Sequence, residues 1–317
     1  MYAAYYGLKE NPFNLSPDPR YFFPGHRHQE ALNHLTYGVR EKKGIIMVTG
    51  DVGTGKTTVC RSFLAGLDDR TTTALIFNSF LSEMELLETL AQEFGFEVHL
   101  NGGEKTRKRY LDALNDFLLR NFAAGRNTVL LIDEAQNLSH GVLEQIRMLS
   151  NLETEREKLI QIVLIGQPEL RDLLLLPVLR QLNERITVRY HLESLDLNQV
   201  KAYIEHRLAV GGGRGRIIFT PFAYRLIHSY SRGVPRRINA ICDQPLQDHL
   251  PEGIIAHSPR EHRAAAKAAR HSCGLINENP RRTGWKRPDV RGGHQIVPIL
   301  FAAHELHQQL ADGANHH

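Results

Sequence analysis

Short runs of apolar, often β-branched residues recur through the first two thirds of the chain, and longer stretches with apolar residues three and four positions apart separate them. An unbroken apolar run is typical of a strand covered on both faces, and the longer spacing is typical of a helix with one buried side. The predicted strands are 44–49, 73–77, 128–132, 160–165 and 186–190, and the predicted helices are 57–67, 82–94, 109–124, 142–152 and 169–182. This alternation predicts an α/β fold, with a parallel five-stranded sheet and flanking helices.

After residue 192 the strand pattern stops and helical patterns continue. Residues 198–210 and 221–231 are predicted helices, the second with Thr220 as its N-cap and Pro221 at its first position. A third predicted helix begins near Pro235 and continues through Cys242. Pro245 is expected to interrupt it. We therefore expect three parts before the tail: an N-terminal segment at 1–43, an α/β domain at 44–192 and a small helical lid at 193–243.

The composition changes at about residue 244. Residues 244–317 contain nine of the 17 histidines and six of the 14 prolines, with only two weakly periodic patches. The histidines show no metal-ligand spacing on a predicted helix, so they give no indication of a metal site. We expect 244–317 to be a largely disordered tail that replaces the last lid helix and leaves the lid truncated.

The overall composition excludes several classes of protein. The net charge of +4, from 39 basic and 35 acidic residues, is too small to indicate a nucleic-acid or lipid partner by itself. Cys60, Cys242 and Cys273 lack metal-ligand spacing, suit a reducing compartment and are predicted to be buried. No apolar run approaches the ~18–20 residues that span a bilayer, and the N-terminus lacks a signal-peptide pattern. We expect a cytoplasmic protein, or one peripheral at the inner face of the membrane.

A phosphate-binding loop lies between the first predicted strand and the helix that follows it. Residues 50–57 match the pattern G-x-x-x-x-G-K-[ST] in the structural context that this pattern requires. Its glycines let successive amides point at phosphates, and the helix N-terminus favours negative charge. Lys56 is expected to reach the β- and γ-phosphates, and the Thr57 hydroxyl to hold Mg²⁺. The predicted ATP-binding residues are Gly50, Asp51, Val52, Gly53, Thr54, Gly55, Lys56, Thr57 and Thr58.

Two carboxylates follow the predicted strand 128–132. Asp133 lies at the carboxyl end of the strand, where a parallel sheet places its ligands, and is predicted to contact Mg²⁺. Glu134 is then placed to act as the general base toward the attacking water. The alternative is an acidic surface pair that caps the next helix.

Three further polar positions fit an ATPase. Gln167 follows the fourth predicted strand and is a candidate to bind the γ-phosphate or the water. Arg185, which we prefer to Arg180, is a candidate arginine finger toward a neighbouring subunit, and Arg236 is a candidate to bind a phosphate held between the domains. The alternatives are a loop glutamine without a role at 167, a cation favoured by a helix C-terminal dipole at 180 or 185, and a solvated surface cation at 236.

Together these motifs resemble those of the AAA+ ATPases, and the match is closer to the ExeA/GspA family, the ATPases of type II secretion and of exosortase or exopolysaccharide loci. The stretches that carry the resemblance are 2–22, Asp133-Glu-Ala-Gln-Asn-Leu138, Leu149-Ser-Asn-Leu-Glu153 and Gly166-Gln-Pro-Glu-Leu170. The resemblance implies that the N-terminal segment packs beside the phosphate loop.

Within that family pattern several residues acquire expected roles. The resemblance implies that Tyr21 and Phe22, with His28, lie near the adenine, that Gln167 is the first sensor and that Arg236 is the second. Taken alone, the aromatic side chains are equally well explained as core residues.

The sequence therefore favours an Mg²⁺-dependent ATPase that supports assembly of a secretion or envelope-export system. A homo-oligomer with inner-membrane secretion or polysaccharide-export partners is expected from the resemblance. One alternative is a DNA-associated ATPase like TniB or an initiator, although residues 1–243 carry a balanced 30 basic and 28 acidic residues. Another is a nucleotide binder with impaired hydrolysis.

Overall fold

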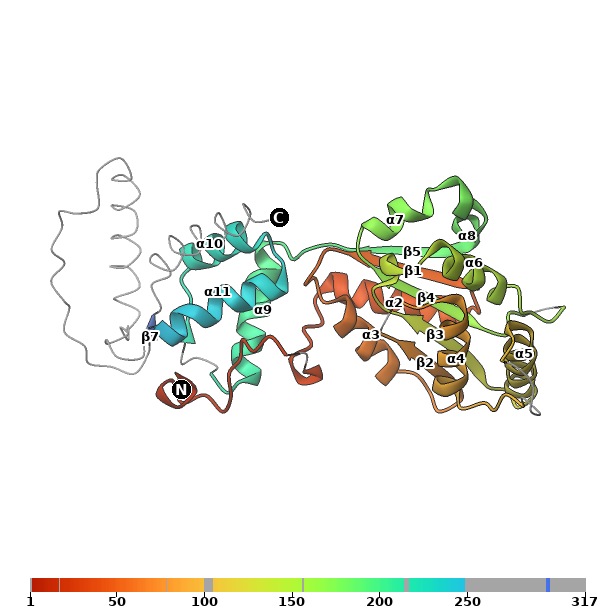
Figure 1. Cartoon of the computed structure of the whole chain (residues 1–317). Helices are drawn as coiled ribbons and strands as arrows, with labels where there is room; N and C mark the ends of the chain where they lie inside the picture. The colour runs from red at the N-terminus through yellow and green to blue at the C-terminus, as the bar shows by residue number, and fades with distance from the viewer. Residues whose placement is uncertain are drawn as a thin grey trace, which may run out of the picture. The chain divides into compact units, whose positions relative to one another are not determined.

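The computed structural model describes residues 2–16, 18–77, 79–99, 105–155, 157–213, 217–248 and 295–296. The chain divides into two compact units (Figure 1). We call Pro17–Ser194 the sheet unit, and Met1–Ser16 with Leu195–His317 the helical unit. The sheet unit is one continuous segment, whereas the helical unit is assembled from two segments that are distant in sequence.

Five parallel strands form the sheet of the sheet unit, in the order β2-β3-β4-β1-β5. The strands are β1 Ile45–Gly50, β2 Thr71–Ile76, β3 Asn127–Ile132, β4 Gln161–Gly166 and β5 Ile186–Leu192. Every residue of the central strands β1 and β4 is buried, which explains their unbroken apolar runs. The predicted fold class, a parallel five-stranded sheet with flanking helices, is confirmed.

Helices cover the two faces of this sheet (Figure 1). They are α2 His26–Arg40, α3 Lys56–Ala65, α4 Glu83–Phe94, α5 Arg107–Ala123, α6 His140–Leu149, α7 Glu169–Leu174 and α8 Arg180–Arg185. Strand β3 shows how the core is divided. Leu130 and Ile132 join a cluster with α4, α5 and α6, while Val129 and Leu131 join a cluster with α2 and α3. The sheet unit therefore has two apolar layers, one on each face.

Helices make up most of the described helical unit. They are α1 Tyr2–Tyr5, α9 Leu197–Val210, α10 Pro221–Ser231 and α11 Pro235–Asp248. The predicted N-cap is confirmed, because the Thr220 hydroxyl accepts a hydrogen bond from the Ala223 amide at 3.1 Å. A short strand, β6 Ile217–Ile218, pairs in parallel with β7 Gln295–Ile296.

Polar contacts fasten residues 2–16 to the rest of the helical unit. Arg207 of α9 is buried and donates hydrogen bonds to the carbonyl oxygens of Pro12 and Asn14, and to the hydroxyl of Tyr203. The side-chain amide of Asn11 donates to an Asp243 carboxylate oxygen at 2.9 Å. The N-terminal segment expected at 1–43 is thus divided, because residues up to 16 pack with the lid helices and later ones with the sheet.

Two predicted helices differ from the structure. The single helix expected at 169–182 is instead α7, the 3₁₀ helix η3 Pro177–Leu179 and α8. Proline disfavours a helical conformation in the preceding residue, and Leu176 is extended, with ψ of 137°. The third lid helix does not stop after Cys242, since α11 continues to Asp248 and includes Pro245.

Other expectations concern the ends of the chain and its cysteines. Cys60 and Cys242 are buried as predicted, and Cys273 lies outside the described residues. Apart from the end of α11 and from β7, the tail expected at 244–317 also lies outside the described residues. Within the part of the chain that is described, no helix has both the length and the apolar character needed to cross a bilayer.

Candidate active site

The phosphate-binding loop joins the carboxyl end of β1 to the start of α3. Gly55 is the N-cap of α3, with a left-handed φ of 99°, and a Cβ there would lie 3.0 Å from the His28 Nε2. Both the conformation and the space therefore favour glycine. Because Gly55 supplies no side-chain cap, the first amides of α3 stay available to an anion.

Lys56 is folded onto the backbone of its own loop. Its Nζ donates to the Gly50 oxygen at 2.8 Å and to the Asp51 oxygen at 3.0 Å, and the residue is 7% exposed. Burial lowers the pKa of Lys56, and the nearby carboxylates of Glu134 and Asp133 oppose that effect. A phosphate oxygen is a stronger, charged acceptor than a carbonyl oxygen, so the ammonium group is suited to exchange one for the other.

A direct hydrogen bond joins the two predicted motifs. The Thr57 hydroxyl donates to Asp133 Oδ2 at 2.8 Å, and Asp133 Oδ1 accepts from the Glu134 amide at 2.9 Å. Asp133 follows β3 and is buried, so α3 and the sheet place two hard oxygen donors together. Within the described ranges, no group of three or more His, Cys, Asp or Glu side chains is arranged to hold a metal ion. Two oxygen donors fit Mg²⁺, which commonly takes its other ligands from water and phosphate.

Two glutamine side chains hold the carboxylate of Glu134. Its Oε2 accepts from Gln136 Nε2 at 2.7 Å and from Gln167 Nε2 at 3.2 Å. The Glu134 backbone has a left-handed φ of 51°, which is unusual for a residue with a side chain, and its carbonyl oxygen accepts from the Ser79 hydroxyl at 2.8 Å. The structure thus brings Gln167 to Glu134, and it adds Gln136 and Ser79, which the sequence analysis missed.

His28 connects α2 to the phosphate loop. Its Nε2 lies 3.0 Å from the Thr54 carbonyl oxygen, so that nitrogen is the donor, and burial lowers the pKa of its ring. Its Nδ1 has no hydrogen-bond partner within the described structure. The rings of Phe22 and His28 meet edge to face, with their centroids 6.1 Å apart, and Tyr21 is buried. Among the three expected adenine neighbours, His28 contacts the loop directly.

A second histidine lies at the carboxyl end of β5. His191 Nδ1 is 3.0 Å from the hydroxyl of Thr49, the residue just before the phosphate loop. Burial, followed by the charge of Arg171, lowers the pKa of His191. The sequence analysis missed this contact, because the pairing of β1 with β5 is not visible in either strand alone.

The three candidate arginines lie in different surroundings. Arg180 is exposed and pairs with Glu184 at 2.9 Å. Arg185 ends α8 and is within electrostatic range of Glu144 and Glu153. Arg236 is exposed near the start of α11, in the helical unit. Their expected roles as finger and second sensor stay predictions.

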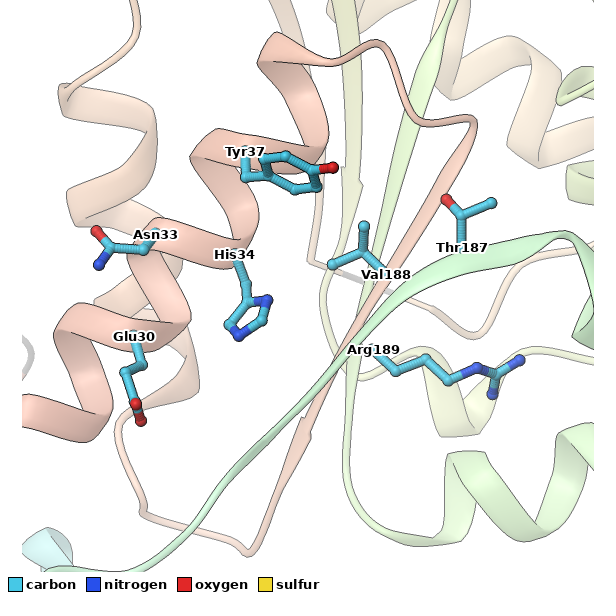
Figure 2. A pocket seen from close by; sticks show the side chains of 7 residues that line it. All are labelled: Glu30, Asn33, His34, Tyr37, Thr187, Val188 and Arg189. Carbon is cyan, nitrogen blue, oxygen red and sulfur yellow. The ribbon is translucent and has the colours of Figure 1, made fainter.

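A separate cavity of about 520 Å³ lies between α2 and the edge strand β5 (Figure 2). His34 and Tyr37 line it from the helix, and Val188 lines it from the strand. Figure 2 shows the Arg189 side chain directed away from α2, and its guanidinium donates to Asn183. None of the residues lining this cavity belongs to the phosphate loop or to the Asp133-Glu134 pair.

Comparison with protein families gives one domain match and one close sequence relative. A family model described as an AAA domain matches residues 39–174. General secretion pathway protein A from Aeromonas hydrophila is 49% identical over 246 residues, which cover 78% of this chain and 44% of that protein. The matched part of this chain therefore covers less than half the length of this relative.

Solved structures share the fold at much lower identity. Cdc6p from Pyrobaculum aerophilum has a TM-score of 0.59 at 17% identity, covering 76% of this chain and 66% of that one. The Aeropyrum pernix ORC1 protein, solved in complex with DNA, has a TM-score of 0.54 at 17% identity, covering 83% of this chain and 70% of that one. At this level of identity the likeness establishes the fold alone.

Proposed function

We propose that this chain is an Mg²⁺-dependent ATPase, because it is similar to AAA domains over residues 39–174 and to general secretion pathway protein A. The observation that carries the proposal is the 2.8 Å hydrogen bond between Thr57 and Asp133. It unites the phosphate loop with the acidic pair, so that the two motifs form one site. The carboxylates of Glu134 and Asp133 both interact electrostatically with Lys56.

In the proposed reaction the phosphate loop and Lys56 bind and orient ATP. The amides at the start of α3 and the Lys56 ammonium supply positive charge to the β- and γ-phosphates. Thr57 and Asp133 would hold Mg²⁺, which neutralises phosphate charge when bound. Tyr21 and Phe22, with His28, would border the adenine, as their resemblance to the family implies.

Glu134 is the proposed general base. A water molecule transfers one proton to its carboxylate while the water oxygen forms a bond to the γ-phosphorus. The bond from the γ-phosphorus to the β–γ bridging oxygen breaks, and the products are ADP and inorganic phosphate. Because Oε2 already accepts two amide groups, Oε1 is the oxygen left to accept the proton.

The remaining polar residues would respond to the phosphoryl group. Gln167 would act as the first sensor, since it follows β4 and already reaches Glu134. Arg185 in a neighbouring copy and Arg236 in the helical unit would supply positive charge to the phosphates, which implies a homo-oligomer.

The proposed cellular role is support of a secretion or envelope-export system. It rests on the name of the Aeromonas hydrophila relative and on 49% identity to it. Partners among inner-membrane secretion or polysaccharide-export components, and a cytoplasmic location or one at the inner face of that membrane, are part of this proposal.

The direct test compares phosphate release by the full chain and by its Glu134→Gln variant. We expect Mg²⁺-dependent release by the parent chain and a loss of about 100-fold or more in the variant, because a general base contributes that much. Glu97→Gln changes an exposed glutamate and is the matched control. Equal, near-zero rates in the parent chain and Glu134→Gln would contradict the proposal and favour a nucleotide binder with impaired hydrolysis.

A DNA-associated ATPase is the second candidate function. Arg232, Arg236 and Arg237 are exposed in the helical unit and would supply part of a basic face. Retention of duplex DNA by the purified protein that weakens steeply with added salt would favour this function. Intact ATP hydrolysis without such retention would favour the secretion role.

A further inference from the structure

Gln136 lies in the short 3₁₀ helix η2 Ala135–Asn137, directly after the acidic pair. Its two side-chain ends have different partners. Nε2 donates to Glu134 Oε2 at 2.7 Å, and Oε1 accepts from the backbone amide of Gln167 at 3.0 Å. The Gln167 amide can only donate, so it fixes which end of the Gln136 side chain faces Glu134. Gln136 is therefore held as a donor toward the carboxylate.

The Gln167 side chain supplies the second donor to Glu134 Oε2, at 3.2 Å. This contact differs from the first in how it is anchored. Gln136 is tied to backbone, whereas the Gln167 side chain can rotate toward a phosphate without disturbing its own backbone amide. If the Gln167 side chain turns from Glu134 to a phosphate, Gln136 remains hydrogen-bonded to the Glu134 carboxylate.

The surroundings leave little freedom to the Gln136 side chain. A Cβ on Gly166, at the end of β4, would lie 2.9 Å from Gln136 Oε1, so the glycine allows this close approach. Ala135 is fully buried, and the backbone of Glu134 is held by Ser79. Residues that follow β3 and residues at the end of β4 therefore both restrict the position of Gln136.

We propose that Gln136 is a positioning residue for ATP hydrolysis, which keeps Oε2 of Glu134 fixed and Oε1 directed to the attacking water while Gln167 binds the γ-phosphate. The inference rests on the proposed ATPase function and adds a residue to it. Gln136 touches neither the water nor the nucleotide and acts through Glu134. Its removal therefore changes the rate of hydrolysis and leaves nucleotide binding intact.

The first experiment measures kcat and ATP affinity separately for Gln136→Met, which keeps the side-chain length and removes the donor. We expect kcat to fall about 10- to 100-fold, because small misplacements of a catalytic group cost rates of this order. The dissociation constant of a fluorescent ATP analogue should stay within about twofold of the parent value. Asn137→Met changes an exposed neighbour in the same 3₁₀ helix and should leave both quantities unchanged.

The second experiment asks whether the effect passes through Glu134. If it does, Glu134→Gln and the double variant Glu134→Gln/Gln136→Met hydrolyse ATP at the same residual rate. A further fall in the double variant, a loss of ATP-analogue binding by Gln136→Met, or an unchanged kcat in Gln136→Met would each overturn the inference. An inactive parent chain would instead remove the proposed function itself, so the two failures are distinguishable.

Discussion

Both units bury apolar side chains, but the helical unit also depends on a buried arginine that joins its two segments. In the sheet unit, successive residues of β3 enter opposite apolar layers, as Leu130 and Leu131 do. In the helical unit, Arg207 is buried and binds two backbone carbonyl groups of the N-terminal segment. Apolar packing tolerates partial losses, whereas a buried polar group that loses its partners carries its full desolvation cost. The two units should therefore respond differently to single substitutions.

The largest expected effect comes from Arg207→Met. The substitution leaves the oxygens of Pro12, Asn14 and Tyr203 without this donor, and we expect a loss of about 4 kcal/mol in unfolding free energy. Urea denaturation measures the loss, and amide hydrogen exchange locates it. Arg225→Met, on the exposed side of α10, is the matched control. Equal loss of exchange protection in both units would contradict the comparison.

Leu131→Ala tests the apolar side of the comparison. Leu131 is fully buried in β3, and its truncation should cost about 3 kcal/mol through lost burial and an internal cavity. Urea denaturation measures this loss too, and protection of amides from hydrogen exchange should fall first in the sheet unit. Leu119→Ala, which truncates an exposed leucine of α5, should cost much less. A similar cost for both substitutions would argue against a tightly packed layer.

Thr57→Ala sharpens the comparison by testing magnesium chemistry and stability at one residue of the sheet unit. We expect about tenfold more Mg²⁺ to be needed for half-maximal ATP hydrolysis, or about 1.4 kcal/mol, because one oxygen donor is lost. The unfolding free energy without nucleotide should fall by about 1–2 kcal/mol, because the buried Asp133 carboxylate loses the Thr57 hydroxyl as a donor and keeps the Glu134 amide. A magnesium titration of ATP hydrolysis measures the effect, with Ser62→Ala in the same helix as the control. An unchanged magnesium requirement would contradict the assignment of Thr57.

The smallest expected effect is on the pH dependence of stability. Burial lowers the pKa of His28 from 6.5, so the unfolded chain takes up a proton at this histidine before the folded chain does. Stability should fall as the pH decreases below 6.5 toward the lower folded pKa, and His28→Gln should reduce that fall. Denaturation at several pH values measures it, with exposed His140→Gln as the control. If the unfolding free energy of the parent chain and of His28→Gln decreased equally with falling pH, the lowered pKa of His28 would be contradicted.

Much of the sheet unit could be predicted from the sequence, because strands covered on both faces have apolar runs that can be recognised locally. The 169–182 helix could not, since its apolar spacing continues across Pro177 while the backbone does not. Arg207 could not be recognised either. Its partners Pro12 and Asn14 are 195 and 193 residues away in sequence, and no local pattern relates them.

The candidate site shows the same division between local and long-range information. The phosphate loop is a single local pattern, and its flanking strand and helix were predicted with it. Gln136 had no such signal, because its importance depends on the backbone amide of Gln167, which follows a different strand. The pairing of Thr49 with His191 likewise depends on β1 and β5 being neighbours in the sheet.

The division of the helical unit into two segments also bears on how the chain folds during synthesis. Residues 2–16 leave the ribosome before Pro17–Ser194, but their partners in α9 and α11 follow only after all of that segment. At about 5–20 residues per second, that segment takes roughly 10–40 s to translate. The sheet unit can fold in that interval, whereas the helical unit has to wait with its N-terminal piece already exposed to chaperones and proteases.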